Sequence, residues 1–212
     1  MPQDVPWLLE RPPARIVLPL VTLVRASLGD ARALAEAAGE SLEHLRPWMP
    51  WAQVAPTTES MAVFLREAVF DWDSGQAFQY VMCQPGSGVV LGGCGLHARL
   101  GPGVLEIGYW VHVSHVGRGI ATAAAGGLTA AALGLAAVDR VEIRCDAANL
   151  RSAAIPRRLG YRLARIEIRA PGTPGETDEH MVWARDRLDD GSTREEAGGE
   201  PRGQEGGADL SR

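Results

Sequence analysis

Residues 111–125, VHVSHVGRGIATAAA, combine small residues, a positive charge and a helix start in the pattern of an anion-binding loop. Gly117 and Gly119 allow the backbone to approach a ligand closely, because glycine carries no Cβ. The N–H groups in the first turn of the following helix have no partner within that helix, and the helix dipole favours negative charge there. Arg118 adds a full positive charge. The segment therefore predicts a site for a pyrophosphate.

Three common phosphate-binding loops have this general pattern. The Walker loop needs a lysine, and all 21 basic residues of the chain are arginines. A dinucleotide-binding loop needs a third glycine where this chain has Thr122, and it needs a second β-α-β half that the sequence does not predict. The third loop has the form Q/R-x-x-G-x-G/A. Residues 116–121 match it except for Val116, which replaces the Gln or Arg side chain and leaves the backbone cradle unaffected.

The segments on either side of the loop read as strands and helices of one mixed sheet. Strand segments carry β-branched and apolar residues between Gly/Pro turns, whereas helical segments repeat apolar residues at spacings of three and four. The predicted strands are 16–23, 78–84, 89–97, 104–112, 140–146, 160–169 and 180–188, and the predicted helices are 28–44, 57–72, 118–137 and 150–159. A single β-α-β unit surrounds the loop. This order predicts an α+β fold rather than a doubly wound one.

Length and charge restrict the classes of function. The chain has 212 residues, enough for one domain with a sizeable core. We expect an N-terminal arm over residues 1–13, a domain over 14–188 and a disordered acidic tail over 189–212. The tail holds seven acids and three arginines, which contributes −4 to the net charge of −5. The domain is therefore nearly neutral and lacks the basic surface that nucleic-acid binding requires.

The sequence has no marks of export, membrane insertion or metal binding. No apolar run approaches the roughly 20 residues of a membrane span, and the N-terminal residues do not resemble a secretory signal. We therefore expect a cytoplasmic protein. Cys83, Cys94 and Cys145 have no metal-ligand spacing and are expected as buried free thiols. His112 and His115 lack a third ligand, so we expect no metal ion.

Five segments of the chain occur in the order and spacing of one known family. They are LRPWMPWA, EIGYWVH, VGRGIATAA, DAANLRSAAIPRRLGY and DEHMVWA, and together they cover roughly residues 14–188. In this combination the chain resembles the RimJ/RimL-type N-acetyltransferases of the GNAT superfamily. The resemblance implies the acyl-CoA N-acyltransferase fold: a bent, mixed, mostly antiparallel sheet of about seven strands with four flanking helices. It also implies acetyl-CoA as cosubstrate, in a V-shaped gap between the fourth and fifth strands.

The same resemblance assigns residues to acetyl-CoA. The pantetheine arm would pair with the backbone of residues 111–113, and the pyrophosphate would lie on residues 117–122. Asn149 and Ser152 match the family's N-x-x-S motif and would contact the cofactor arm. The predicted cofactor-binding residues are Val111, His112, Val113, Val116, Gly117, Arg118, Gly119, Ile120, Ala121, Thr122, Asn149 and Ser152.

Acetyl transfer to an amine requires proton transfers. An amine attacks a thioester only when it is neutral, and a positioned base increases the rate by about 10²–10⁴. Glu106 is a lone acid in an apolar strand and matches the family's E-I-G-Y, so it is our first candidate for the base. His112 is the alternative, because imidazole titrates near neutral pH. The tyrosine that many GNAT enzymes use as general acid is replaced by Pro156, which leaves water or Ser152 to protonate the leaving thiolate.

Two tryptophans complete the site that the resemblance implies. Trp48 and Trp51 lie where this branch of the family lines its acceptor groove, and Glu106 would meet the acceptor amine there. The predicted reaction is acetyl transfer to a primary amine, namely the α-amino group of a protein or peptide. Acetylation of a small-molecule amine, such as an antibiotic or a polyamine, is the alternative that an acidic groove would favour. A non-catalytic CoA-binding module is a further alternative, and a homodimer is left open.

Overall fold

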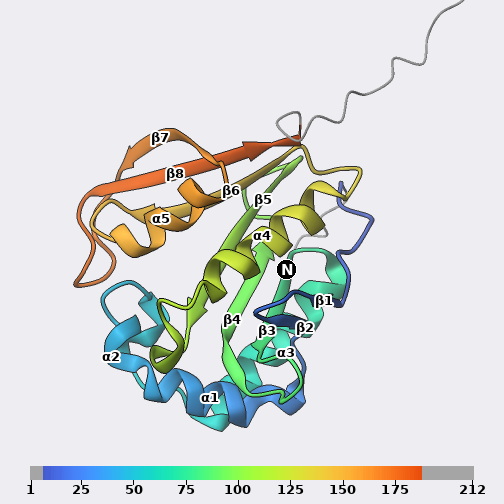
Figure 1. Cartoon of the computed structure of the whole chain (residues 1–212), viewed down its shortest axis with the longest axis vertical. Coiled ribbons are helices and arrows are strands. Elements are labelled where there is room, and N and C mark those ends of the chain that lie inside the picture. The colour runs from blue at the N-terminus through green and yellow to red at the C-terminus, as the bar shows by residue number, and fades with distance from the viewer. Residues whose placement is uncertain (1–6, 188–212) are drawn as a thin grey trace, which may run out of the picture.

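The computed structural model describes residues 7–187, which form one mixed sheet with helices packed against it (Figure 1). The eight strands lie in the order β1-β2-β3-β4-β5-β6-β8-β7, and of the neighbouring pairs only β5 and β6 are parallel. The strands are β1 Arg15–Val17, β2 Thr22–Arg25, β3 Ala77–Cys83, β4 Val90–His97, β5 Val104–Val111, β6 Arg140–Asp146, β7 Arg162–Ile168 and β8 Glu179–Asp186. The predicted α+β class and mostly antiparallel sheet are confirmed, with eight strands rather than about seven.

The extra strand comes from the segment 16–23, which we predicted as a single strand and which is a hairpin. β1 and β2 pair antiparallel, and the turn between them is closed by the N–H of Leu18, which donates to Val21 O at 3.0 Å. Pro19 lies in this turn. Because proline has no N–H to donate to a ladder, it interrupts a strand and is compatible with a turn.

The helices predicted over 28–44 and 118–137 are shorter in the structure, and another helix begins where its cap predicts. They are α1 Ala31–Glu40, α2 Leu42–Leu45, α3 Thr58–Ser74, α4 Ile120–Leu133 and α5 Leu150–Arg158, with 3-10 turns at Leu28–Asp30, Pro50–Gln53 and Val113–His115. The predicted helix 28–44 breaks at Ser41, whose buried hydroxyl donates to Ala37 O at 2.7 Å. α3 starts after Thr57, whose hydroxyl accepts a bond from Ser60 N at 3.2 Å.

Two hydrophobic cores hold the helices to opposite faces of the sheet. α4 contributes fully buried Ala124, Ala125 and Leu128 to the larger core, which also contains Ala153 and Ile155 of α5. α1 and α3 form a smaller core with Val81 and other residues of the opposite face. The small side chains of α4 allow this helix to lie close to β4 and β5.

The two halves of the sheet separate at β5 and β6. Their parallel pairing runs from Val104 opposite Arg140 to Ile107 opposite Ile143, and then stops. Beyond it, β5 pairs only with β4, and β6 pairs only with β8. Figure 1 shows the strands diverging at this point. The predicted gap therefore exists between the expected segments, 104–112 and 140–146. They are the fifth and sixth strands rather than the fourth and fifth, because residues 15–25 form a hairpin of two strands.

The segment before β1 packs against the domain. Leu8 is buried in the larger core, and the Arg11 guanidinium donates to the carbonyls of Leu8, Trp72 and Asp73. The domain boundary after residue 13 stays a prediction, and the predicted tail over 189–212 lies outside the described residues. Within residues 7–187, no helix is both long and apolar enough to cross a membrane.

Candidate active site

A cavity of about 1630 Å³ opens at the gap between β5 and β6. Its walls are α4, α5, the end of β5, the turn of the β1–β2 hairpin and the loop around Trp48. Most small-molecule pockets have volumes of about 300–1,000 Å³. The cavity is therefore large enough for an extended ligand that carries both an apolar arm and phosphates.

The edge of β5 that faces the gap has free hydrogen-bonding capacity. The N–H of His112 donates to Leu91 O on the β4 side at 2.8 Å. Backbone groups of a strand alternate between its two edges, so those of Tyr109 and Val111 point away from β4, towards the gap. The ladder with β6 ends at Ile107. An amide-containing chain lying in the gap would therefore find a strand edge to pair with.

The residues 111–113, which we predicted to bind together, do not all face the cavity. Val111 lines it, whereas His112 and Val113 do not. The N–H of His112 is bonded to β4, and the N–H of Val113 donates to Ser41 Oγ at 3.0 Å. Only Val111 of the three therefore has both the position and the free backbone edge for a ligand.

The start of α4 has the backbone geometry that an anion site, as predicted from its sequence, would need. Gly117 and Gly119 have φ angles of 76° and 79°, in the left-handed region that glycine adopts without a steric penalty. Gly119 is the N-cap, no side chain caps it, and the first turn of α4 contains no acid. Ile120, Ala121 and Thr122 line the cavity. Their amides precede the first bond within the helix, so they remain available to a phosphate.

Arg118 does not line this cavity, although Val116 and both glycines do. Its guanidinium is exposed and lies 3.4 Å from His115 Nδ1. Two other arginines, Arg151 and Arg158 of α5, line the cavity instead. The motif IPRRLGY contained Arg158, but its side-chain direction depends on how α5 packs, which the sequence does not reveal.

Tyr109 and Ser152 meet across the gap. The Tyr109 hydroxyl lies 3.0 Å from Ser152 Oγ, and both residues line the cavity. Burial raises the pKa of Tyr109, so its hydroxyl stays protonated at neutral pH. Asn149 holds this end of α5 in place, because its side-chain oxygen accepts from Ser152 N at 3.1 Å. Sequence reasoning missed Tyr109, although it stands in the EIGYW segment.

The family model of the acetyltransferase (GNAT) domain matches residues 21–162, and this range contains the gap, the α4 loop and α5. The chain belongs to the GNAT family. It is therefore an N-acetyltransferase whose cosubstrate is acetyl-CoA, in agreement with the resemblance found in the sequence. No curated protein matches the chain.

Solved GNAT structures have the same fold. The chain is similar to the microcin C7 self-immunity acetyltransferase MccE in complex with acetyl-CoA and AMP, with 20% identity and a TM-score of 0.75, covering 82% of this chain and 97% of that one. It is also similar to RimL, the ribosomal L7/L12 α-N-protein acetyltransferase, solved with coenzyme A. The identity is 21% and the TM-score 0.73, and the match covers 84% of this chain and 98% of that one. For Mycobacterium smegmatis RimJ in complex with CoA-disulfide, the identity is 23% and the TM-score 0.72, and the match covers 84% of this chain and 86% of that one. At these identities, the structures establish the shared fold alone.

Glu106 of this GNAT domain lies on the sheet face opposite Tyr109, because side chains alternate along β5. It is buried and does not line the cavity. Arg99 binds both carboxylate oxygens, with distances of 2.9 Å from Nε to Oε2 and 2.6 Å from Nη2 to Oε1. The carboxylate is therefore held in one orientation, and an amine would reach it from the face of the sheet that α4 does not cover.

His112, the alternative base, faces α1 rather than the GNAT cavity. Its Nε2 lies 3.0 Å from Glu40 Oε2, and its Nδ1 accepts from Ser114 N at 3.1 Å. Both ring nitrogens are thus engaged, and the ring holds the turn after β5 against α1. Among residues 7–187, no group of three His, Cys, Asp or Glu side chains is arranged to bind a metal ion.

The two tryptophans predicted for the acceptor groove lie in different places. Trp48 lines the cavity together with Trp110 of β5, whereas Trp51 does not. Trp51 borders a smaller groove beside α3 and packs edge-on against Trp110, with ring centroids 5.9 Å apart. Trp48 and Trp110 therefore form the aromatic wall of the GNAT cavity, and Trp51 supports it from behind.

Proposed function

We propose that the chain transfers the acetyl group of acetyl-CoA to the α-amino group of a protein or peptide. The observation that carries this proposal is the chemistry of the cavity wall. Among the described residues that line the cavity, aromatic side chains are present and carboxylates are absent. A polyamine or an aminoglycoside-like antibiotic carries several positive charges and would require acidic partners. The N-terminus of a peptide carries a single positive charge, and the first side chains of the peptide can pack on Trp48 and Trp110.

The ionisation of the acceptor supports the same choice. The pKa of an α-amino group is about 8, whereas that of a lysine side chain is about 10.4. At pH 7 a larger fraction of α-amino groups than of lysine side chains is therefore neutral, and an α-amine depends less on deprotonation by a base. RimL, which shares the fold, is an α-N-protein acetyltransferase, and its acceptor is of the class proposed here.

We propose distinct roles for the residues around the gap. Acetyl-CoA supplies an acyl group activated as a thioester. The backbone edge at Val111 would hold the pantetheine arm, and the amides of Ile120, Ala121 and Thr122 would bind the pyrophosphate. Glu106 would accept the proton that the amine loses, as predicted from the sequence. Tyr109 takes the place of the missing general acid, and its hydroxyl would donate a proton to the departing sulfur, with Ser152 orienting it.

Acetyl-CoA should stabilise the protein, and NAD should not. At a concentration of about 100 times its Kd, a ligand that binds only the native state adds about 2.7 kcal/mol to the free energy of unfolding. For a domain of this size, that raises Tm by roughly 5–10 °C. Differential scanning fluorimetry measures the shift. An equal shift with NAD, or none with acetyl-CoA, would contradict the proposed cofactor.

Acceptor peptides complete this experiment. Tetrapeptides that begin with alanine or serine should release coenzyme A thiol in the presence of acetyl-CoA, whereas the same peptides with a blocked N-terminus should not. Spermidine serves as the small-molecule amine. Turnover of spermidine and none of the peptides would overturn the proposal in favour of the small-molecule alternative.

Replacing Tyr109 with phenylalanine should lower kcat about tenfold, which is less than the roughly 10²–10⁴-fold that general acid–base catalysis typically contributes. The effect is modest because a thiol with a pKa of about 8.5 leaves readily without full protonation. Tyr161→Phe is the matched control, since Tyr161 is also buried and its hydroxyl lies 2.6 Å from Thr129 Oγ1, away from the cavity. The two variants should show the same Tm shift with acetyl-CoA. Equal rates for both would remove Tyr109 from the proton transfers.

A further inference from the structure

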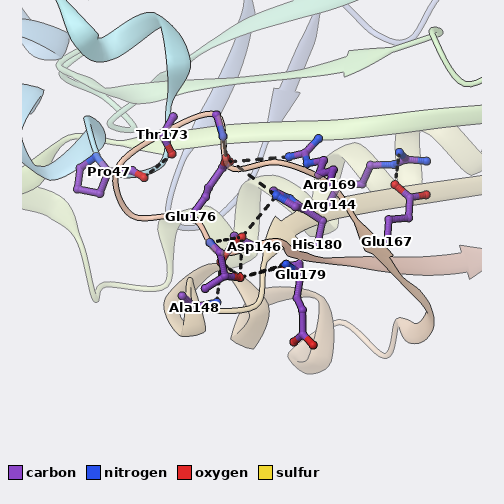
Figure 2. A network of polar contacts seen from close by, with 12 residues as sticks. Pro47, Arg144, Asp146, Ala148, Glu167, Arg169, Thr173, Glu176, Glu179 and His180 are labelled. Atoms are coloured by element: carbon purple, nitrogen blue, oxygen red, sulfur yellow. Dashed lines mark hydrogen bonds and ion pairs between the residues drawn. The ribbon is translucent and has the colours of Figure 1, made fainter.

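The loop between β7 and β8 reaches across to the segment that carries Trp48. Pro47 O accepts two hydrogen bonds from this loop, from Thr173 Oγ1 at 2.6 Å and from Gly175 N at 3.0 Å. Figure 2 shows Thr173 facing Pro47 between the two segments. We call these three residues the Pro47 clasp. It joins the immediate neighbour of Trp48 to a loop more than a hundred residues further along the chain.

The clasp tolerates few substitutions at its two donor positions. A Cβ atom at Gly175 would lie 2.6 Å from Pro47 O and 2.7 Å from Pro47 Cβ, closer than a Cβ atom comes to non-bonded neighbours in real structures. Any side chain at this position would therefore push the two segments apart. Thr173 is buried, with 6% of its surface exposed, so the loss of its hydroxyl would leave Pro47 O with one partner fewer in a place that water does not readily reach.

The same loop is anchored at its other end to the start of α5. The buried Asp146 carboxylate accepts from Thr177 N at 2.9 Å, from Thr177 Oγ1 at 3.1 Å and from Ala148 N at 2.8 Å. His180 Nε2 lies 3.4 Å from the same carboxylate. Figure 2 shows Asp146, Ala148 and His180 together at this anchor. Asp146 ends β6, directly before Asn149 and Ser152 on the cavity wall.

The loop also has an internal brace. Glu176 Oε2 accepts from Gly172 N at 2.7 Å, and the N–H of Glu176 donates to Thr173 O at 3.2 Å. These bonds fix the spacing between the clasp and the anchor. The loop thus connects the Trp48 segment to the residues at the start of α5, the helix that carries Ser152.

We infer that the Pro47 clasp sets the position of the acceptor wall relative to the reacting atoms, and that Thr173 and Gly175 are positioning residues for the acceptor. This inference rests on the proposed function. Trp48 and Met49 line the cavity directly after Pro47, whereas the lining residues to which we assign acetyl-CoA lie on α4, α5 and β5. Loosening the clasp therefore moves the Trp48 side of the acceptor wall and leaves Trp110, the α4 amides and Val111 in place.

Thr173→Val and Thr173→Ser test the clasp with matched variants. Valine keeps the shape and removes the hydroxyl, and serine keeps the hydroxyl. With an alanine- or serine-initiated tetrapeptide as acceptor, Thr173→Val should raise the KM for the peptide about tenfold, since small misplacements in a site cost one to two orders of magnitude. The KM for acetyl-CoA and the Tm shift with acetyl-CoA should be unchanged. Thr173→Ser should behave as the wild type.

Gly175→Ala should raise the KM for the peptide at least as much, and Gly172→Ala should not. A Cβ at Gly172 would meet only the flexible end of Glu176, at 3.4 Å, and would keep the N–H of the brace. Hydrogen exchange of residues 46–53 provides a measurement that needs no acceptor: exchange should be faster in Thr173→Val and Gly175→Ala and unchanged in the two controls.

The outcomes separate the inference from the proposed function. If wild-type protein acetylates no tetrapeptide, the proposed function fails, and the exchange rates alone decide whether the clasp holds the Trp48 segment. If the wild type is active and the two clasp variants keep the wild-type KM for the peptide, the inference is wrong. A parallel rise in the KM for acetyl-CoA would equally overturn it, because the effect would then be a general loosening of the domain.

Discussion

Replacing Glu106 with glutamine should lower the turnover of the acceptor peptide about a hundredfold, within the range for a lost general base. Glutamine has nearly the shape of glutamate and can still accept a bond from Arg99 through its oxygen, but it cannot take a proton from an ammonium group. Glu106 does not line the cavity in which we propose that acetyl-CoA binds, so the Tm shift with acetyl-CoA should equal that of the wild type. Steady-state kinetics and scanning fluorimetry measure the two quantities.

The neighbouring strand provides the matched control. Glu142 lies directly opposite Glu106 in the parallel ladder of β5 and β6. It is similarly buried and is paired with Arg144 at 2.8 Å and with Arg165 at 3.4 Å, whereas Glu106 is paired with Arg99. Glu142→Gln therefore removes a buried, arginine-paired carboxylate from the same face, with at least as large an electrostatic loss. If both variants lose activity equally, the loss reflects the ion pairs of this face and not proton transfer. Full activity of Glu106→Gln would remove Glu106 from the mechanism.

Replacing Gly119 with aspartate should weaken acetyl-CoA binding roughly a hundredfold relative to Gly119→Asn. Both side chains tolerate the left-handed conformation better than other residues do, and a Cβ here would make only an ordinary contact of 3.5 Å with Leu20. The carboxylate would stand where we propose that the pyrophosphate binds. Two charges about 5 Å apart repel by roughly 1–3 kcal/mol at effective dielectric constants between 20 and 80, and the pyrophosphate carries more than one. Isothermal titration calorimetry measures the difference.

The stability of the two ligand-free Gly119 variants tests whether charge at the α4 terminus causes the weaker binding of acetyl-CoA. A carboxylate at a helix N-terminus stabilises the helix by about 0.3–1 kcal/mol. The ligand-free Asp variant should therefore have a higher Tm than the Asn variant, while binding acetyl-CoA more weakly. Equal loss of binding in both variants would mean that any side chain at position 119 blocks the site sterically, and that the charge of the α4 terminus is not what selects the ligand.

The sequence predicts the parts of this site whose geometry is local. The loop with Gly117 and Gly119 leads directly into α4 as its sequence predicts, and both glycines have the positive φ angles that this residue adopts without strain. Strand β6 has the predicted bounds, and α5 differs from its predicted range by a single residue. These features depend on residues within one or two turns of each other. Propensity, caps and glycine conformations act over that distance, so they are readable without knowing the rest of the fold.

Only the tertiary structure decided which predicted residues meet. Strand β8 inserts between β6 and β7, and this order places the β7–β8 loop next to Pro47. Residues of one short segment were separated: Val111 lines the cavity while His112 binds Glu40, and Trp48 lines it while Trp51 does not.

The physical reason is the range of the interactions involved. The spacing of residues along a strand or helix determines which side chains share a face, so local features such as the loop at α4 can be predicted from the sequence. Which face borders a cavity depends on contacts such as Tyr109 with Ser152 and Thr173 with Pro47, between segments that come together only when the sheet is assembled. For this chain, the amino-acid sequence by itself determined the geometry of the loop to which we assign acetyl-CoA. Packing decided which side chains form the proposed acceptor wall and which groups contact Glu106 and Tyr109.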